Sequence, residues 1–291
     1  MHSRFSTSMP TEHAMAAPVA LFLFAHQDDE FGVLHQILAE KKRGHRVMCV
    51  YFTTGAPCGR NPDRRNQESL SVLSSLGVHS DDVFFAGSLL SIDDGCLSEN
   101  LQVASEWLGV WVRRLFPVVS VYVMAWEGGH PDHDALHAIA VQIFHEREMG
   151  HLVRQFPLYN GYRRSGPFYR VLLPLCGNGP VEWTMIPWGN RFRFLGYCLR
   201  YPSQLKTWIG LLPSVLLHYL FNGGQTLQPV SISRTEERPH DGHLYYEKRG
   251  FCSWRVLESR LSHWREARTL NGQGIAISPG RQVKGVQSST P

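Results

Sequence analysis

Residues 19–30 read VALFLFAHQDDE, an apolar run that ends in a histidine, a glutamine and three carboxylates. A short, continuous apolar segment is typical of a strand that is buried on both faces of a sheet. Such a strand normally ends in turn residues, so the titratable side chains at 25–30 need a chemical explanation. The segment predicts a buried strand that leads directly into a functional turn.

Strand-like and helix-like segments alternate over the first half of the chain. We expect strands at 19–25, 46–53, 83–87 and 118–126, and helices at 31–44, 63–77, 98–116 and 131–147. This alternation predicts an α/β fold, a Rossmann-like sheet of mostly parallel strands with helices on both faces. In such sheets, ligands bind outside the carboxyl ends of the strands.

After residue 150 the alternation breaks down. We expect strands at 156–163, 168–175, 181–187 and 243–251, and helices at 191–205, 206–221 and 253–270. We interpret this part as an α+β elaboration packed on the same sheet. The predicted organisation is a flexible tail (1–16), a single domain (17–272) with a catalytic half (17–150) and an acceptor-side half (151–272), and a disordered tail (273–291).

The composition narrows the class of protein. The 291 residues are 43% hydrophobic, enough for one large core, and the six cysteines form no C-x-x-C pair, which favours reduced thiols in the cytoplasm. The net charge of +4 combines an acidic first half with a basic second half. The basic half could attract an anionic substrate, although oppositely charged solvated faces explain it equally well. We expect no nucleic-acid partner.

The most apolar stretch, WIGLLPSVLLHYLF at 208–221, is too short to span a bilayer and contains Pro213. We therefore expect no transmembrane segment. Core packing, a dimer contact and, least favoured, peripheral membrane contact stay open for this stretch.

A second polar cluster, GGHPDHDALH at 128–137, follows the fourth expected strand. If the first and fourth strands run parallel in one sheet, the two clusters emerge at the same edge and can meet. His26, Asp29 and His133 would then supply two imidazoles and one carboxylate to one ion, leaving a position open for water, as in hydrolytic zinc sites. Ferrous iron accepts the same ligands. We expect Zn²⁺, with Fe²⁺ as the alternative.

The neighbouring polar residues suggest catalytic roles. Asp28 adjoins a ligand without being one, which suits a general base. His130, if protonated, could donate to the oxyanion of a tetrahedral intermediate, and Asp132 could hold it in that state. Ordinary helix capping is the competing explanation for Asp29 and Asp132. His137 is better explained as a packed histidine than as a further ligand.

Five segments carry a resemblance to a known family: AHQDDE (25–30), GHRVMCVYFTTGAP (44–57), RRNQESLSVLSSLGV (64–78), SIDDG (91–95) and GGHPDHDA (128–135). In this order they resemble the PIG-L or LmbE-like metal-dependent N-deacetylases, named for N-acetylglucosaminyl-phosphatidylinositol de-N-acetylase. The resemblance extends from about Val19 to Phe144, half of the chain. Beyond residue 150 it fades.

The resemblance implies a role for each matching residue. The implied roles are metal ligands for His26, Asp29 and His133, a catalytic base for Asp28, an oxyanion donor and its partner for His130 and Asp132, a sugar contact for Arg65, and a sugar-hydroxyl contact for Asp94. Arg65 could instead lie on a solvated helix face, and Asp94 could be an ordinary turn residue before Gly95.

Gln27 departs from the family, which has proline after the first histidine. Proline fixes φ and lacks a donor, so we expect Gln27 to loosen the turn and to offer an amide that could reach the substrate. The change removes no ligand, and we expect activity to survive it.

Together these observations predict a zinc-dependent hydrolase. We expect it to remove acetyl from an N-acetylated amino sugar of the GlcNAc type on a larger acceptor, which could carry a phosphate or a lipid. The alternatives are a related amidase acting on a non-sugar or sugar-thiol amide, and a carbohydrate-binding relative without turnover. A nucleotide-binding domain is disfavoured, because AHQDDE replaces the glycine-rich turn that such a domain needs.

Overall fold

The computed structural model describes residues 17–57, 60–165 and 168–275. The predicted tail at 1–16 and residues 276–291 of the predicted tail at 273–291 lie outside the described residues. Helix α9 (Trp254–Ile275) continues past the domain boundary predicted at residue 272.

A seven-stranded sheet forms the centre of the described part of the chain, in the order β3-β2-β1-β4-β5-β9-β8. Strands β1 to β5 pair in parallel, and β9 is antiparallel to both β5 and β8. The strands are β1 Val19–Phe24, β2 Arg46–Tyr51, β3 Val83–Phe85, β4 Val118–Met124, β5 Val153–Phe156, β8 Glu182–Met185 and β9 Gly224–Pro229, with a separate pair β6 Tyr159–Asn160 and β7 Arg170–Val171. The predicted α/β fold with a mostly parallel sheet is confirmed.

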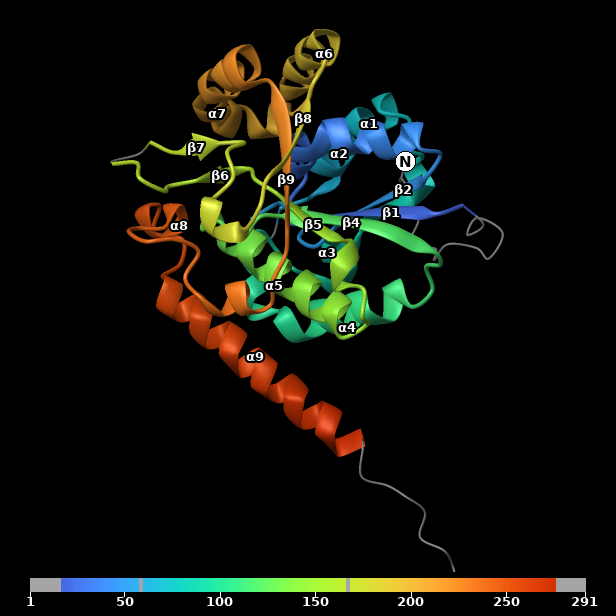
Figure 1. The fold of residues 1–291 in the computed structure, drawn as a ribbon, viewed down its shortest axis with the longest axis vertical. Coiled ribbons are helices and arrows are strands. Elements are labelled where there is room, and N and C mark those ends of the chain that lie inside the picture. The colour runs from blue at the N-terminus through green and yellow to red at the C-terminus, as the bar shows by residue number, and fades with distance from the viewer. Residues whose placement is uncertain (1–16, 58–59, 166–167, 276–291) are drawn as a thin grey trace, which may run out of the picture.

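Helices cover both faces of the sheet. Figure 1 shows α1 and α2 on one face and α4 and α5 on the other, with α9 along the outside of the second layer. The helices are α1 Leu34–Lys42, α2 Asp63–Ser75, α3 Ala86–Leu90, α4 Leu101–Val112, α5 Pro131–His145, α6 Trp188–Cys198, α7 Leu205–Leu217, α8 Tyr245–Lys248 and α9. Shorter 3-10 turns include η2 Asp29–Val33, η4 Leu97–Glu99 and η7 Pro202–Gln204, and a π-helical turn, η8 His218–Asn222, follows α7.

The double covering explains why β1 consists of apolar residues without alternation. Every residue of β1 is at most 1% exposed, because both of its faces pack against helices. The core therefore holds this strand rigidly at the centre of the sheet. The turn that follows at residue 25 is positioned by a strand that is buried along its whole length.

In the second half, one predicted element is wrong and one strand was missed. Residues 243–251 contain the short helix α8, not a strand: the N–H of Tyr245 donates to Gly128 O at 2.8 Å, and Glu247 accepts from the N–H of Leu244 at 3.1 Å. Strand β9 was not predicted, because its buried side chains include Gln225 and Gln228. Both side-chain amides donate to backbone carbonyls, so their polar groups are hydrogen-bonded although they are buried. The strand therefore lacks the alternating apolar pattern by which a strand is usually predicted.

Helix α7 and turn η8 contain the whole apolar stretch 208–221. Trp208, Val215 and Tyr219 are buried, whereas Ile209, Leu217 and Phe221 are more than half exposed. Within the described residues, no helix is long and apolar enough to cross a membrane.

Candidate active site

The two polar clusters lie side by side because their strands are neighbours. Strand β1 pairs with β4 in parallel, with Leu23 opposite Val123, so both strands end at the same edge of the sheet. The strands that follow β1 in the chain, β2 and β3, lie on one side of this pair, and the strand that follows β4, β5, lies on the other. Open α/β sheets bind ligands at such a reversal. The clusters therefore occupy the switch point of the sheet.

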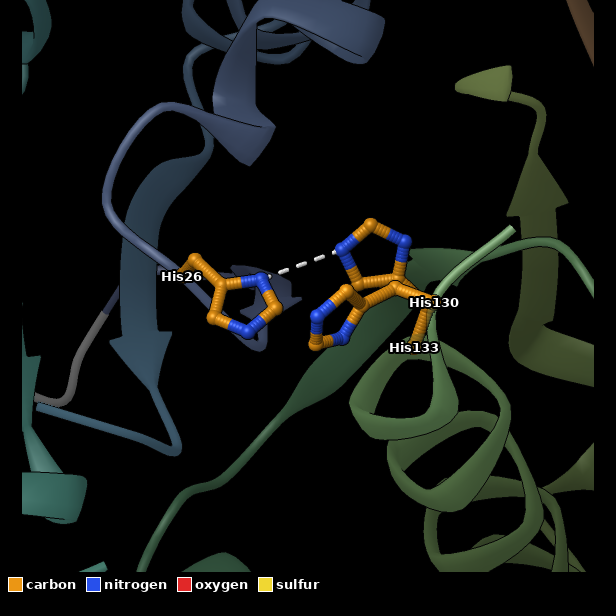
Figure 2. Close-up of side chains that lie close together, drawn as sticks. All are labelled: His26, His130 and His133. Carbon is orange, nitrogen blue, oxygen red and sulfur yellow. Dashed lines mark hydrogen bonds between the residues drawn. The ribbon is translucent and has the colours of Figure 1, made fainter. Parts of the chain in front are cut away.

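The three residues predicted to bind a metal converge there. Nδ1 of His26 lies 3.1 Å from Nε2 of His133, and that nitrogen lies 3.1 Å from Oδ1 of Asp29. Nδ1 of His26 lies 3.6 Å from Oδ2 of Asp29. All three residues are buried. Figure 2 shows the His26 ring on one side of the site and the rings of His130 and His133, from the start of α5, on the other.

These spacings fit a divalent cation. Ligand atoms that lie about 2.0–2.1 Å from a tetrahedral ion are about 3.3 Å apart. The two separations at Nε2 of His133 are close to this value, and the 3.6 Å distance from His26 is to the other oxygen of Asp29. His26 presents its other ring nitrogen, Nε2, to Oδ2 of Asp132 at 3.1 Å, the kind of contact that orients ligating histidines. Nδ1 of His133 is buried and has no hydrogen-bond partner among the described residues, so Nε2 is the nitrogen that faces the cluster.

Asp28 lies beside this cluster in an unusual backbone conformation. Its φ of 119° is in the left-handed region, which is costly for a non-glycine residue and is concentrated at functional turns. Its carboxylate lies 3.2 Å from Nη2 of Arg65. Burial raises the pKa of Asp28 to about 7, although the Arg65 guanidinium opposes the shift. A carboxylate with a pKa near neutral pH is suited to accept a proton during catalysis.

Arg65 and Asp94, the two predicted sugar contacts, both line the cavity above the cluster. Arg65 donates to the carbonyl oxygens of Gln27, at 2.7 Å, and of Gly55, so it also braces two loops of the site. The Asp94 side chain is 30% exposed and lies 3.2 Å from Nε2 of His26. Burial opposes ionisation of Asp94, but the nearby imidazole of His26 holds its pKa below the ordinary value. The carboxylate is therefore available as an acceptor for a ligand hydroxyl.

His130 caps the N-terminus of α5 and lines the cavity. Its Nδ1 accepts a hydrogen bond from the backbone N–H of Asp132 at 3.3 Å. Burial, reinforced by the neighbouring His26, lowers the pKa of His130 to about 3 and so favours the neutral ring. A neutral imidazole that accepts at Nδ1 carries its proton on Nε2. His130 can thus donate from Nε2 without a charge, and it is also close enough to His26 and His133 to share an ion with them.

Asp132 pairs with a different partner from the one predicted. Its carboxylate accepts from the N–H groups of Gly95 at 2.7 Å and Leu97 at 3.0 Å, and it lies 3.1 Å from Nε2 of His26. Its distance to Nδ1 of His130 is 3.9 Å. The first turn of α5 directs this carboxylate toward the turn at 95–97, where Gly95 and Leu97 donate to it. Asp132 therefore orients His26 and the loop that carries Asp94.

Gln27 does not line the cavity, which corrects the prediction that its amide reaches a substrate. The side chain is completely buried and donates to Oδ1 of Asn66 at 2.7 Å. The turn points this side chain toward α2. The amide thus joins the turn to α2.

Glu30 is a site residue to which the sequence analysis assigned no role. Its buried carboxylate accepts from the backbone N–H of Asp28 at 3.0 Å and from the hydroxyl of Tyr201 at 2.8 Å. The only sequence signal was its place in AHQDDE, because Tyr201 lies 171 positions away. Glu30 therefore ties the strained turn to the second half of the chain. His137, by contrast, contacts Met124 O through Nδ1 at 2.7 Å, which agrees with a packed histidine.

A cavity of about 490 Å³ opens over the cluster. Its polar floor comes from the ends of β1 and β4 and from α2. Its remaining wall is formed largely by the second half of the chain, including α7, Tyr159, Tyr169 and Tyr245. A space of this size is typical of small-ligand sites.

Comparisons with known proteins agree with this geometry. Residues 21–144 match the family model PIG-L, described as GlcNAc-PI de-N-acetylase. No curated protein matches the chain.

Several solved structures share the fold. One is a deacetylase–bog complex from the teicoplanin biosynthesis pathway, with 18% identity, 73% of this chain and 98% of that chain covered, and a TM-score of 0.57. A zinc-inhibited form of teicoplanin deacetylase Orf2 has 17% identity, 73% and 98% coverage and a TM-score of 0.56. N,N'-diacetylchitobiose deacetylase from Pyrococcus horikoshii has 13% identity, 78% and 88% coverage and a TM-score of 0.50.

The structural likenesses concern the fold, whereas the family match extends from β1 through α5 and includes both polar clusters. Residues 21–144 thus match the PIG-L family of de-N-acetylases, and this match supports a deacetylase, which is a hydrolase.

Proposed function

We propose that this protein is a divalent-metal-dependent N-deacetylase that acts on an N-acetylated amino sugar of the GlcNAc type. The observation that carries the proposal is the convergence of His26, Asp29 and His133, with spacings of 3.1 to 3.6 Å. Of these residues, His26 and Asp29 line one cavity together with Asp28. The family match supports the reaction type. The proposal takes residues 17–272 as one deacetylase domain, supported by the pairing of β9 with β5 in one sheet.

In this proposal His26, Asp29 and His133 hold the ion. When bound, the ion would polarise the amide carbonyl and make water a stronger nucleophile. Zinc is the expected metal and ferrous iron the alternative, because two imidazoles and one carboxylate suit both.

The other site residues move protons and stabilise charge. Asp28 accepts a proton from the attacking water and returns one to the departing amine, giving a carboxylic acid and a free amino sugar. His130 donates from Nε2–H to the oxygen of the amide as negative charge develops there. Asp132 keeps the His26 ring in place through the 3.1 Å contact to Nε2.

Asp94 and Arg65 orient the sugar. Asp94 is the better candidate for a direct hydroxyl contact, because its carboxylate is partly exposed and ionised. Arg65 already donates to two backbone carbonyls, so its main task is to hold Asp28 and the surrounding loops. Arg249, an exposed cation that lines the cavity, supports an acceptor that carries a phosphate. The cytoplasmic location stays a prediction, which cell fractionation would test.

Free-amine detection over a panel of N-acetylhexosamine compounds tests the proposal. We expect amine release from the metal-loaded protein, none after chelation, and recovery when metal is restored. Non-sugar N-acetyl amines in the same panel separate this activity from that of a general amidase. Amine release that persists in fully metal-depleted protein would contradict the proposal, as would the absence of release from every amino sugar.

A further inference from the structure

A four-residue segment from the second half of the chain contacts the turn that carries Asp28. Residues 201–204 join α6 to α7 (Figure 1) and contain the 3-10 turn η7. The family match ends at residue 144, so it assigns no role to this segment. The side chains of the segment nevertheless reach the residues that surround Asp28.

Two members of the segment are hydrogen-bonded to buried carboxylates. Tyr201 donates from its hydroxyl to Glu30 at 2.8 Å, and Glu30 in turn accepts from the N–H of Asp28. Ser203 donates to Glu68 of α2, from its backbone N–H at 3.0 Å and from its hydroxyl. Glu30 and Glu68 are both buried. The segment therefore cannot shift relative to the turn or to α2 without breaking buried hydrogen bonds.

Gln204 is the member of the segment that faces the guanidinium of Arg65. One end of its side-chain amide lies 3.1 Å from Nε and 3.2 Å from Nη1 of Arg65. A guanidinium offers only donors, so the amide oxygen is the atom that faces it. Gln204 precedes the first residue of α7, but its side chain makes no capping hydrogen bond there. The contact with Arg65 is therefore the main polar interaction of this side chain.

The other donors of Arg65 are already committed to the loops of the site. Nη2 donates to Gln27 O at 2.7 Å and contacts Oδ1 of Asp28 at 3.2 Å, and Nη1 also donates to Gly55 O. Among the described residues, Nε has no acceptor other than Gln204. Arg65 is buried, so water does not readily replace a lost acceptor. Gln204 thus completes the set of acceptors that fixes the plane of the guanidinium.

We propose that Gln204 is a positioning residue of the active site, which fixes the Arg65 guanidinium so that Arg65 holds the Asp28 carboxylate in place for proton transfer. The inference rests on the proposed function and adds to it a residue from the second half of the chain. A displacement of about 1 Å in a reacting group can cost about 10²-fold in rate. Because Asp28 acts in the chemical step, the loss should appear in kcat and not in KM.

Gln204→Met tests this role, because methionine has a similar length but lacks the amide oxygen. With the amino sugar that the substrate panel identifies, we expect kcat to fall about 10- to 100-fold, while KM stays within about threefold and the metal content is unchanged. Gln204→Glu restores an acceptor for the guanidinium, so kcat should recover to within about fivefold of the wild type. The matched control is Gln67→Met, since Gln67 is exposed on α2, the helix that carries Arg65; it should leave kcat unchanged.

A double-mutant cycle shows whether Gln204 acts through Arg65. In Arg65→Lys the planar fork is replaced by a single ammonium group, so Gln204 has no guanidinium to orient. We expect Gln204→Met to lower kcat by less than about twofold in that background. Equal fold losses in both backgrounds would overturn the inference. A raised KM with unchanged kcat in the single variant would also overturn it, because Gln204 would then be a substrate contact.

Solvent exchange of the Arg65 Nε–H separates this inference from the proposed function. The exchange rate is measured by NMR on arginine-labelled, zinc-loaded protein, and it also carries the test if Arg65→Lys does not fold. We expect exchange at least about tenfold faster in Gln204→Met than in the wild type and in Gln67→Met, because the hydrogen bond that protects this proton is lost. If no compound releases amine, the proposed function fails, and the exchange rate still decides whether Gln204 fixes Arg65. Equal rates in Gln204→Met and the wild type would overturn the inference.

Discussion

Asp132 provides the sharpest test of how the site is held together. The side chain is completely buried, and its carboxylate accepts from the N–H groups of Gly95 and Leu97 while contacting His26. Asp132→Ala leaves the buried N–H of Leu97 without an acceptor, whereas the N–H of the exposed Gly95 can donate to water instead. A buried donor without an acceptor costs about 1–3 kcal/mol, so we expect the free energy of unfolding to fall by about that amount. Asp132→Asn keeps one acceptor oxygen and should lose about half as much.

The assay is denaturant unfolding of the metal-free proteins, followed by tryptophan fluorescence, because bound metal would add its own stabilisation. Asp81→Asn is the matched control, since the Asp81 side chain is 73% exposed and should change stability by less than about 0.5 kcal/mol. If Asp132→Ala does not fold, the Asn variant carries the test. An Asp132→Asn protein as stable as the Asp81→Asn control would refute the reasoning.

Three other substitutions test separate parts of the account. Asp28→Asn, which tolerates the left-handed backbone, should retain the metal but lower kcat by about 10² or more; unchanged turnover in metal-loaded protein would remove the role of base. Tyr201→Phe removes a hydrogen-bond donor to the buried carboxylate of Glu30 and should lower the free energy of unfolding by about 1–3 kcal/mol. An unchanged free energy of unfolding would show that the contact does not stabilise the protein. Burial raises the pKa of Asp134 to about 8, so its contribution to stability is complete below about pH 4 and is lost as the pH rises through 8. In the wild type the free energy of unfolding should therefore fall by up to about 1.4 kcal/mol per pH unit between these values, and the Asp134→Asn variant should lack this fall. Unfolding curves of both proteins at pH 5.5 and 7.5 measure the difference. An equal shift with pH in both proteins would contradict the raised pKa of Asp134.

The sheet and the meeting of the two clusters could be predicted from the sequence because they follow from local rules. The apolar segments before His26 and before His130 have the length of buried strands, and parallel strands in one sheet end at one edge. The distance between His26 and His133 in the chain, 107 residues, is therefore no obstacle. Chemistry placed at strand ends is predictable once the alternation of strands and helices is recognised.

The partners of individual side chains could not be predicted in this way. The pairing of Asp132 with His26 depends on which N–H groups the turn at 95–97 presents. The direction of Gln27 toward Asn66 depends on the packing of α2. Such contacts depend on which rotamer each side chain adopts in the folded protein.

The second half of the chain shows the same limit for whole elements. Tyrosines favour strands in general, but Tyr245 begins a short helix because Gly128 O and Glu247 satisfy the local backbone groups. Strand β9 has no apolar alternation, and its buried glutamines find acceptors that come from distant segments. Hydrogen bonds between segments that are distant in the chain leave no periodic pattern in the sequence.

The central claim is that His26, Asp29 and His133 share one divalent ion. X-ray absorption at the metal edge, with elemental analysis of protein purified without added metal, tests it directly in the wild type and in His133→Ala. The account predicts about one ion per chain, with two nitrogen ligands at about 2.0–2.1 Å and oxygen completing the shell, and one fewer nitrogen or loss of the ion in the variant. An all-oxygen shell, or a spectrum and occupancy that His133→Ala leaves unchanged, would contradict it.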